Sequence, residues 1–219
     1  MTKVLAVNSV IKKGLSMKKI ILSLLSVLLI FAFLLSSCSS LITIEYEDGC
    51  FVDKKNGVIY HDASVSIEPV TLTEEYAKYK DTVFYEMKGV EPTEWFSEEY
   101  DGIGAVYYAD GIECPTLATF EANKIYLCAS EIITVSLGNI EDESIINAVI
   151  DAFENEEPCE VPDNIQRYCL KFVSEKYPFL YYNIILLTAN DGTRYVYDRG
   201  EKLCVPIGTV FDDIIDGLS

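Results

Sequence analysis

The fold is decided by residues 167–207, which read RYCLKFVSEKYPFLYYNIILLTANDGTRYVYDRGEKLCVPI. This stretch holds four segments rich in aromatic and β-branched residues, and glycine-containing turn sequences separate the later ones. The segments are residues 167–174, 179–188, 194–198 and 203–207, with turns at Asn190-Asp191-Gly192 and Arg199-Gly200. Successive strands joined by short turns predict an antiparallel meander.

One helix is predicted on each side of this meander. Before it, apolar residues recur at helical spacing from Ile145 to Phe153, after an acidic run at 141–143 that suits a helix N-terminus. After it, Thr209 is expected to cap a C-terminal helix that ends near Gly217. Residues 155–163 are rich in proline and glutamate, so a loop is expected there.

The part of the chain before these elements is predicted to form a sheet built from hairpins. One hairpin joins residues 50–53 to 58–61 through Asn56-Gly57, the strongest short turn signal. A second is expected to join residues 103–109 to 112–114 through Asp110-Gly111. Further strands are expected at residues 41–45, 65–70, 83–88, 124–129 and 132–137, the last two in central positions.

Two short helical segments are expected between these strands. Residues 73–80 are charged and rich in tyrosine, which suggests one or two helical turns. Residues 91–96 suggest a short helix opened by Pro92, with Trp95 and Phe96 turned toward the core. The sequence therefore predicts an α+β fold, a mainly antiparallel sheet with two or three short helices, over a single acidic domain at residues 42–219.

Residues 17–38 read MKKIILSLLSVLLIFAFLLSSC and are typical of a secretory leader. Lys18 and Lys19 form a positive n-region, residues 20–35 form an apolar h-region, and small residues lead to Cys38. A membrane-spanning helix needs about 20 apolar residues, and this run is shorter and is followed by no cationic cluster. Residues 17–37 are therefore predicted to be a cleaved signal peptide.

The end of the leader, Leu35-Ser36-Ser37-Cys38, resembles the lipobox of bacterial lipoproteins. The resemblance implies that the Cys38 thiol receives a diacylglyceryl group and that the chain is cut before Cys38. Two or three acyl chains anchor a protein stably, which implies a lipid-anchored protein on the extracytoplasmic side of the cell membrane, with residues 38–41 as a short tether. The alternative is an ordinary secretory signal in which this cysteine has no role.

Residues 1–16 precede a leader that has its own start at Met17. Lys12-Lys13-Gly14 can be encoded by a purine run that resembles a ribosome-binding site. We therefore expect translation to begin at Met17, and residues 1–16 are left out of the fold as an N-terminal extension.

The charge of the chain is strongly negative. Residues 1–37 carry five of the seventeen basic residues and none of the thirty-five acidic ones, so the net charge falls from −18 to −23 when they are removed. Such a domain is repelled by nucleic acid and by anionic lipid, so membrane contact is expected only through the lipid on Cys38. The fifteen tyrosines offer surface for an envelope protein or polysaccharide partner, although core packing explains most of them.

Six cysteines follow Cys38, and none of them has the C-x-x-C spacing of a thioredoxin-like motif or of most zinc sites. An even number outside the cytoplasm permits disulfides, while a domain of this size also accommodates buried free thiols, so both readings stay open. Cys114 and Cys159 stand beside prolines and are expected to be the more accessible. The six are Cys50, Cys114, Cys128, Cys159, Cys169 and Cys204.

Candidate chemistry is sparse. His61 is the only histidine, so any Cys–His pair would have to use it, and Cys50 is near in sequence. Acidic clusters occur at Glu45, Glu47 and Asp48; at residues 141–143; at Glu154, Glu156, Glu157 and Glu160; and at Asp212, Asp213 and Asp216. None has the EF-hand pattern, so surface and helix-cap roles are favoured over a calcium site or a glycosidase pair.

The residues therefore predict no cofactor, no metal site and no defined catalytic site. The favoured function is a binding or interaction module on a lipid anchor. The alternative is a cell-envelope hydrolase that uses carboxylates or Cys50 with His61. A deep polar pocket around His61 or a carboxylate pair would favour the enzyme, whereas a shallow tyrosine-rich face would favour binding.

Overall fold

The computed structural model describes residues 41–98, 104–131, 135–163 and 166–218, and Leu41–Ser219 forms one compact unit. The predicted extension, the signal peptide and Cys38 lie outside the described residues. The sheets are mostly antiparallel, as expected, but the fold is mainly β and not the predicted α+β class, with two short helices among the described residues. Within the same ranges, no helix is long and apolar enough to cross a membrane.

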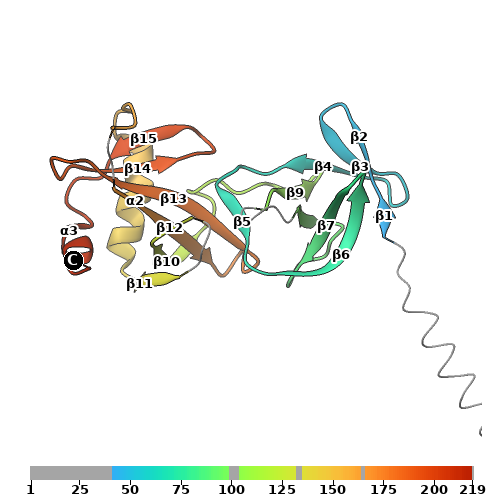
Figure 1. The fold of residues 1–219 in the computed structure, drawn as a ribbon, viewed down its shortest axis with the longest axis horizontal. Helices are drawn as coiled ribbons and strands as arrows, with labels where there is room; N and C mark the ends of the chain where they lie inside the picture. Colours follow the sequence, from blue (N-terminus) through green and yellow to red (C-terminus); the bar gives the residue numbers. More distant parts are fainter. Residues whose placement is uncertain (1–40, 99–103, 132–134, 164–165, 219) are drawn as a thin grey trace, which may run out of the picture. The chain divides into compact units, whose positions relative to one another are not determined.

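The first of two sheets has eight strands in the order β1-β6-β7-β8-β9-β4-β3-β2 (Figure 1). All neighbours are antiparallel except β1 and β6, which are parallel. The strands are β1 (Ile42–Thr43), β2 (Glu45–Glu47), β3 (Cys50–Asp53), β4 (Val58–Asp62), β6 (Leu72–Tyr79), β7 (Thr82–Met87), β8 (Trp95–Glu98) and β9 (Val106–Ala109). The predicted hairpin at β3 and β4 is confirmed.

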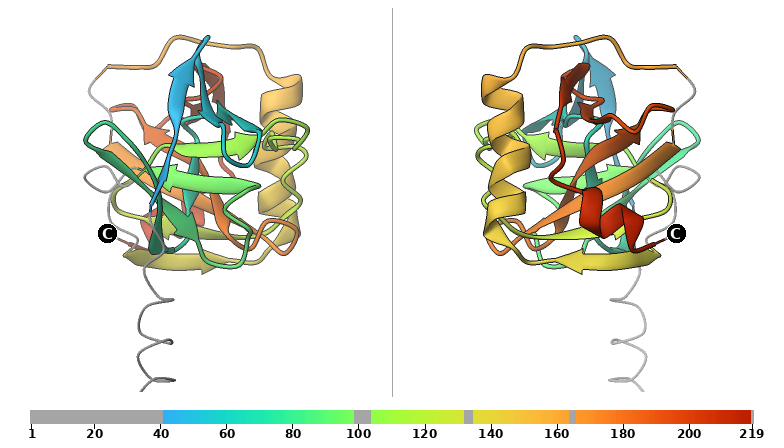
Figure 2. Two further views of the ribbon diagram at one scale, coloured as in Figure 1. Left: turned by 90° about the vertical axis from the view of Figure 1, so that its right-hand side faces the viewer. Right: turned by 90° about the vertical axis from the view of Figure 1, so that its left-hand side faces the viewer.

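This first sheet closes on itself at Ile44. Only Ile44 separates β1 from β2, although these strands stand at opposite ends of the strand order, so the sheet must curve until its ends meet (Figure 2, left). The Ile44 N–H donates to the Lys78 carbonyl at 3.0 Å and the side chain is buried. The enclosed cluster, here called the first core, consists of Ile44, Phe51, Tyr60, Tyr76, Ala77, Phe84, Phe96, Tyr107 and Ala109.

The second sheet has the order β11-β10-β12-β13-β14-β15, and β5 pairs with the free part of β13. Its last four strands are the predicted meander, which is confirmed to within a few residues at each end. The strands are β5 (Ile67–Pro69), β10 (Ala122–Cys128), β11 (Ser136–Ile140), β12 (Gln166–Ser174), β13 (Leu180–Thr188), β14 (Arg194–Asp198) and β15 (Leu203–Pro206).

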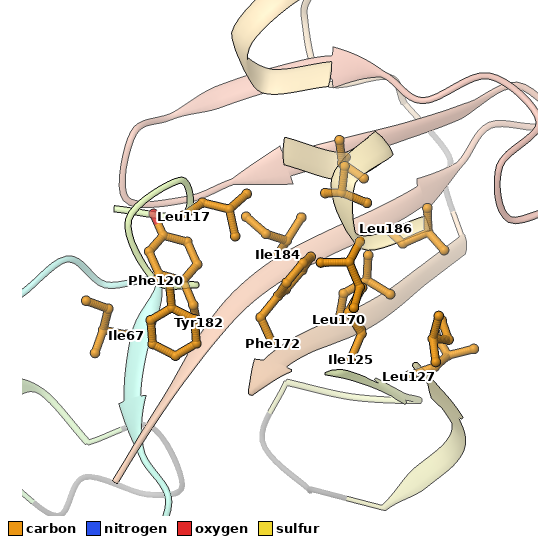
Figure 3. Close-up of a cluster of buried hydrophobic side chains, with 14 of the residues drawn as sticks. Ile67, Leu117, Phe120, Ile125, Leu127, Leu170, Phe172, Tyr182, Ile184 and Leu186 are labelled. Atoms are coloured by element: carbon orange, nitrogen blue, oxygen red, sulfur yellow. The ribbon is translucent and has the colours of Figure 1, made fainter. Parts of the chain in front are cut away.

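The predicted helix before the meander is α2 (Glu143–Asn155), which packs against β10 and β15 (Figure 2, right). Its apolar side chains and one face of the second sheet form the second core, part of which Figure 3 shows around Phe120, Phe172 and Tyr182. The C-terminal helix is α3 (Asp212–Asp216), with Gly217 at its end as predicted. Thr209 is not its cap, because the helix starts three residues later and has no side-chain cap.

Strand β8 serves both cores. Trp95 belongs to the second core and Phe96 to the first, and both are buried, because successive residues of a strand point to opposite faces. The Trp95 ring lies 5.8 Å from the ring of Phe179, next to β13. The two sheets are therefore joined by packed side chains as well as by chain connections.

The predicted helices at residues 73–80 and 91–96 are wrong. Residues 73–79 belong to β6, where bulges allow the consecutive residues Tyr76 and Ala77 both to be buried, which hides the alternation of a strand. Pro92 opens a single turn, closed by the Trp95 N–H on the Glu91 carbonyl at 3.1 Å, and β8 follows immediately.

Three predicted strands also differ from the structure. Residues 112–114 form no strand, because β4 and β8 already occupy both edges of β9. The strand expected at 41–45 is divided at Ile44. Residues 132–134 lie outside the described residues, and β11, which starts at Ser136, is an edge strand and not a central one.

Candidate functional site

Cys50 and His61 are cross-strand neighbours in the first sheet. Phe51 pairs with Tyr60 between β3 and β4, so Cys50 stands opposite His61, and its Sγ lies 3.5 Å from His61 Nδ1. The other ring nitrogen, Nε2, lies 3.3 Å from Oδ1 of Asp110, directly after β9. The structure thus brings together the pair that the sequence suggested and adds a carboxylate that sequence reasoning missed.

Backbone hydrogen bonds hold this trio, Cys50, His61 and Asp110, in place. The buried Asp53 carboxylate accepts from the N–H groups of Lys55 and Asn56 at 2.9 and 3.1 Å, and thereby closes the turn that sets the register of β3 and β4. The Asp110 N–H donates to the Ile59 carbonyl at 2.7 Å, which keeps Asp110 beside β4. An imidazole between a thiol and a carboxylate is the arrangement of cysteine nucleophiles.

The surroundings of the trio are open. One side of the His61 ring faces Tyr108, with ring centroids 5.6 Å apart, and burial raises the pKa of the Tyr108 hydroxyl. The His61 side chain is 36% exposed and that of Asp110 is 73% exposed. None of the three cavities described below is lined by Cys50 or His61.

Most of the acidic clusters take part in ion pairs and helix capping. Glu45 and Glu47 both pair with Lys54, at 2.6 and 2.7 Å. Asp142 caps α2 by accepting from the Ser144 N–H at 2.9 Å, and these hydrogen bonds lower the pKa of its carboxyl. Within the described ranges, no three histidine, cysteine, aspartate or glutamate side chains converge as a metal site.

All six cysteines after Cys38 carry free thiols in the structure. Cys128, Cys169 and Cys204 are buried, and Cys159 is exposed in the loop after α2, as expected for a loop residue beside proline. Cys114 is half-buried, and burial raises the pKa of its thiol. Cys128 and Cys169 face each other in register between β10 and β12.

Two of the three cavities are lined mostly by apolar or acidic groups. One of about 220 Å³ lies between α2 and the 116–118 turn, beside Asp198 and Glu201. Asp198 is fully engaged there, since it accepts from Ser66 Oγ at 2.5 Å and from Tyr182 Oη at 2.7 Å. Another of about 490 Å³ lies between the end of α2 and residues 206–210.

The third cavity, of about 410 Å³, contains two arginines and is here called the arginine pocket. It lies at the end of the second sheet where β10 ends and β12 begins, and its lining residues are Ala129, Ser130, Glu131, Arg167, Tyr168, Cys169 and Arg199. The chain has only three arginines, and the third, Arg194, is buried between Asp212 and Asp216. A strongly acidic domain therefore places both of its remaining guanidinium groups at one cavity.

The two arginines of this pocket are held differently. Arg199 Nη1 lies 2.7 Å from Glu131 Oε2, and the two side chains are 35% and 24% exposed. Arg167 is exposed at the start of β12, and no ion pair joins it to a carboxylate within the described ranges. Sequence reasoning missed this pocket, and the only signal was the scarcity of arginine in the chain.

No protein-family model, no curated protein and no solved structure matches this chain. The candidate sites therefore rest on geometry and charge alone. Two sites stand out: the arginine pocket, and the trio of Cys50, His61 and Asp110.

Proposed function

We propose that this chain is a lipid-anchored binding protein of the bacterial envelope, attached to the membrane through Cys38 and facing the extracytoplasmic side. The order of charged, apolar and small residues in 17–38, with its lipobox-like end, supports the anchor. The net charge of −23 without residues 1–37 supports a membrane contact made by lipid and not by a basic face.

The ligand site is the arginine pocket, and the ligand presents an anionic group. The observation that carries this proposal is the placement of Arg167 and Arg199 in one cavity of an otherwise acidic domain. A guanidinium group binds carboxylate or phosphate oxygens through two parallel N–H donors. Glu131 engages one side of Arg199 and fixes its orientation, while Arg167 supplies the charge that an anion would meet.

A carboxylate from a wall peptide is the preferred ligand group. A cavity of about 410 Å³ accepts a small fragment and not a folded partner. Envelope phosphates share the same chemistry, so the experiment has two arms. One arm uses a soluble disaccharide–peptide fragment of peptidoglycan with free carboxylates, and the other uses glycerol phosphate.

Arg167→Gln is expected to weaken binding of the peptidoglycan fragment by about 10- to 150-fold, because a hydrogen bond to a charged group contributes about 1.5–3 kcal/mol. Isothermal titration of the full chain in detergent micelles measures this dissociation constant. Lys88→Gln is the matched control, since it removes the same charge from an exposed residue in the turn after β7. Absence of binding in both arms, or equal binding by the Arg167 and Lys88 variants, would refute the pocket as the ligand site.

A second candidate function is thiol chemistry at Cys50, and the specific observation is the contact of its Sγ with His61 at 3.5 Å. If His61 accepts the thiol proton and Asp110 orients the ring, Cys50 is a nucleophile at neutral pH. The exposure of the His61 and Asp110 side chains makes this the weaker candidate.

His61→Gln is expected to slow alkylation of Cys50 by iodoacetamide at pH 6.5 by about 10-fold or more, since general-base assistance typically contributes 10²–10⁴-fold. Mass spectrometry of the tryptic peptide that ends at Lys54 follows Cys50, and Cys159 in peptide 125–167 serves as the exposed internal reference. If Cys50 reacts no faster than Cys159, and His61→Gln changes neither rate, the trio has no catalytic role.

A further inference from the structure

We infer that Cys159 and Cys204 are a disulfide-forming pair that fastens the loop between α2 and β12 to strand β15. The Cys159 N–H donates to the Cys204 carbonyl at 2.9 Å, and the Cys159 thiol approaches the same carbonyl oxygen at 3.5 Å. These contacts join residues that are 45 positions apart in the chain. A backbone hydrogen bond therefore holds the two cysteines side by side.

The backbone contact fits the geometry of a disulfide. The N–H···O bond between Cys159 and Cys204 brings their backbones to about the 4.7–4.9 Å spacing of neighbouring strands. A disulfide needs Cα atoms about 4.4–6.8 Å apart. Burial raises the pKa of the Cys204 thiol to about 12, and the neighbouring Cys159 side chain adds to that effect.

The difference in exposure between the two thiols sets the order of the reaction. Cys159 is exposed and Cys204 is buried, so Cys159 meets the oxidant, a low-molecular-weight disulfide. The Cys159 thiolate attacks one sulfur of that disulfide, forms a mixed disulfide and releases one thiolate. Cys204 loses its proton and attacks the Cys159 sulfur, which forms the Cys159–Cys204 bond and releases the second thiolate. The external disulfide is reduced by two electrons and the protein is oxidised by two.

The competing pair is Cys128 with Cys169, which stand in register between β10 and β12. Both are fully buried, and burial raises the pKa of both thiols. Burial slows reaction of both thiols with an external disulfide, even though residue Cys169 lines the arginine pocket, whereas Cys159 lies at the surface. The Cys159–Cys204 pair should therefore form first under native conditions.

This link would operate in an oxidising compartment, which rests on the extracytoplasmic location proposed above. It does not depend on the arginine pocket, so its test and the ligand test can fail separately. Its effect would be to restrain the exposed loop at residues 156–163, which leads into β12 and hence toward Arg167.

The full chain in detergent micelles, incubated with oxidised glutathione and then alkylated, tests the pair. Trypsin places Cys159 in peptide 125–167 and Cys204 in peptide 203–219, so the expected product is a link between these two peptides. A further cut after Glu131 and Glu154 separates Cys128 from Cys159. A link from 125–167 to the short peptide 168–171 would instead identify Cys128–Cys169 and overturn the inference.

Oxidation is also expected to raise the midpoint of thermal unfolding by about 4 to 16 °C, from typical disulfide stabilisation in a domain of this size. Cys159→Ser should abolish both the linked peptides and the shift, because the exposed partner is gone, whereas Cys50→Ser should retain both. The inference is wrong if both thiols still react with the alkylating reagent after the folded protein has been treated with oxidised glutathione. It is also wrong if oxidation still raises the unfolding midpoint of Cys159→Ser.

Discussion

Lys171→Met is expected to lower the free energy of unfolding by about 3–5 kcal/mol, because it leaves a buried carboxylate without the ammonium that now pairs with it. Lys171 on β12 is 1% exposed, and its Nζ forms an ion pair with Glu68 on β5, which is 7% exposed. The variant keeps the apolar stem and removes only the charge. The midpoint of thermal unfolding, followed by circular dichroism on the full chain in detergent micelles, should fall by about 6 to 20 °C.

Lys176→Met provides the matched control for this prediction. Lys176 pairs with Glu121, but both side chains are about half exposed, and such pairs contribute about 0–1 kcal/mol. Adding Glu68→Leu to Lys171→Met should restore most of the lost stability, since an apolar pair tolerates burial. The prediction is wrong if Lys171→Met loses no more stability than Lys176→Met, or if the double variant recovers none of it. Either result would show that the buried ion pair does not contribute the expected stability.

The Lys171–Glu68 pair matters because of where it lies in the topology. Strand β5 is reached directly from β4 of the first sheet, and it pairs with β13 of the second. Lys171 stands on the far side of β13, opposite Asn183, so the ion pair spans one strand and fastens β5 to the sheet. It joins residues 103 positions apart, which no local pattern in the sequence could reveal.

Local signals in the sequence predicted local structure well. The hairpin of β3 and β4 follows from the turn signal Asn56-Gly57, and Gly57, at φ +71°, is the residue of the 54–57 turn that takes the positive φ. The helix α2 follows from the recurrence of apolar residues between Ile145 and Phe153. The meander follows from strong strand formers separated by turn residues, and its strands pair in sequence order.

Long-range pairing was not predictable from those signals. The closure at Ile44 requires β1 and β2 to pair with strands at opposite ends of the sheet. Strand β5 follows the first-sheet strand β4 in the chain but pairs with β13 of the second sheet. The sequence of residues 65–70 predicts a strand and does not indicate which sheet it joins. In β6 the bulge near Tyr76 removed the alternation by which strands are recognised.

The candidate sites show the same division between local and long-range signals. Cys50 and His61 flank one short hairpin, so the sequence could suggest their pairing, while Asp110 reaches them only because β9 lies beside β4. Arg167 lies at the start of β12 and Arg199 in the turn after β14, and they line one cavity together with residues 129–131. When a site is assembled from strands far apart in the chain, its residues have no characteristic spacing in the sequence.

Phe96→Ala is expected to destabilise the protein by about 3–5 kcal/mol, from lost burial and the cavity left in the first core. The Phe96 ring is fully buried, with ring centroids at 4.5 Å from Tyr60 and 5.1 Å from Phe84. The enclosed sheet offers little room for collapse, because its two ends are already joined at Ile44. Tyr46→Ala is the control in the same sheet, since that residue is 50% exposed.

The measurement can also show whether the two sheets unfold together. Trp95 is the only tryptophan and packs into the second core beside Phe179, so its fluorescence reports on the contact between the sheets. Because β8 carries Trp95 on one face and Phe96 on the other, Phe96→Ala should shift the fluorescence and circular dichroism midpoints equally in a urea titration. A shift in only one of the two signals would mean that the closed first sheet unfolds as a separate unit, and Tyr46→Ala should move both midpoints by little.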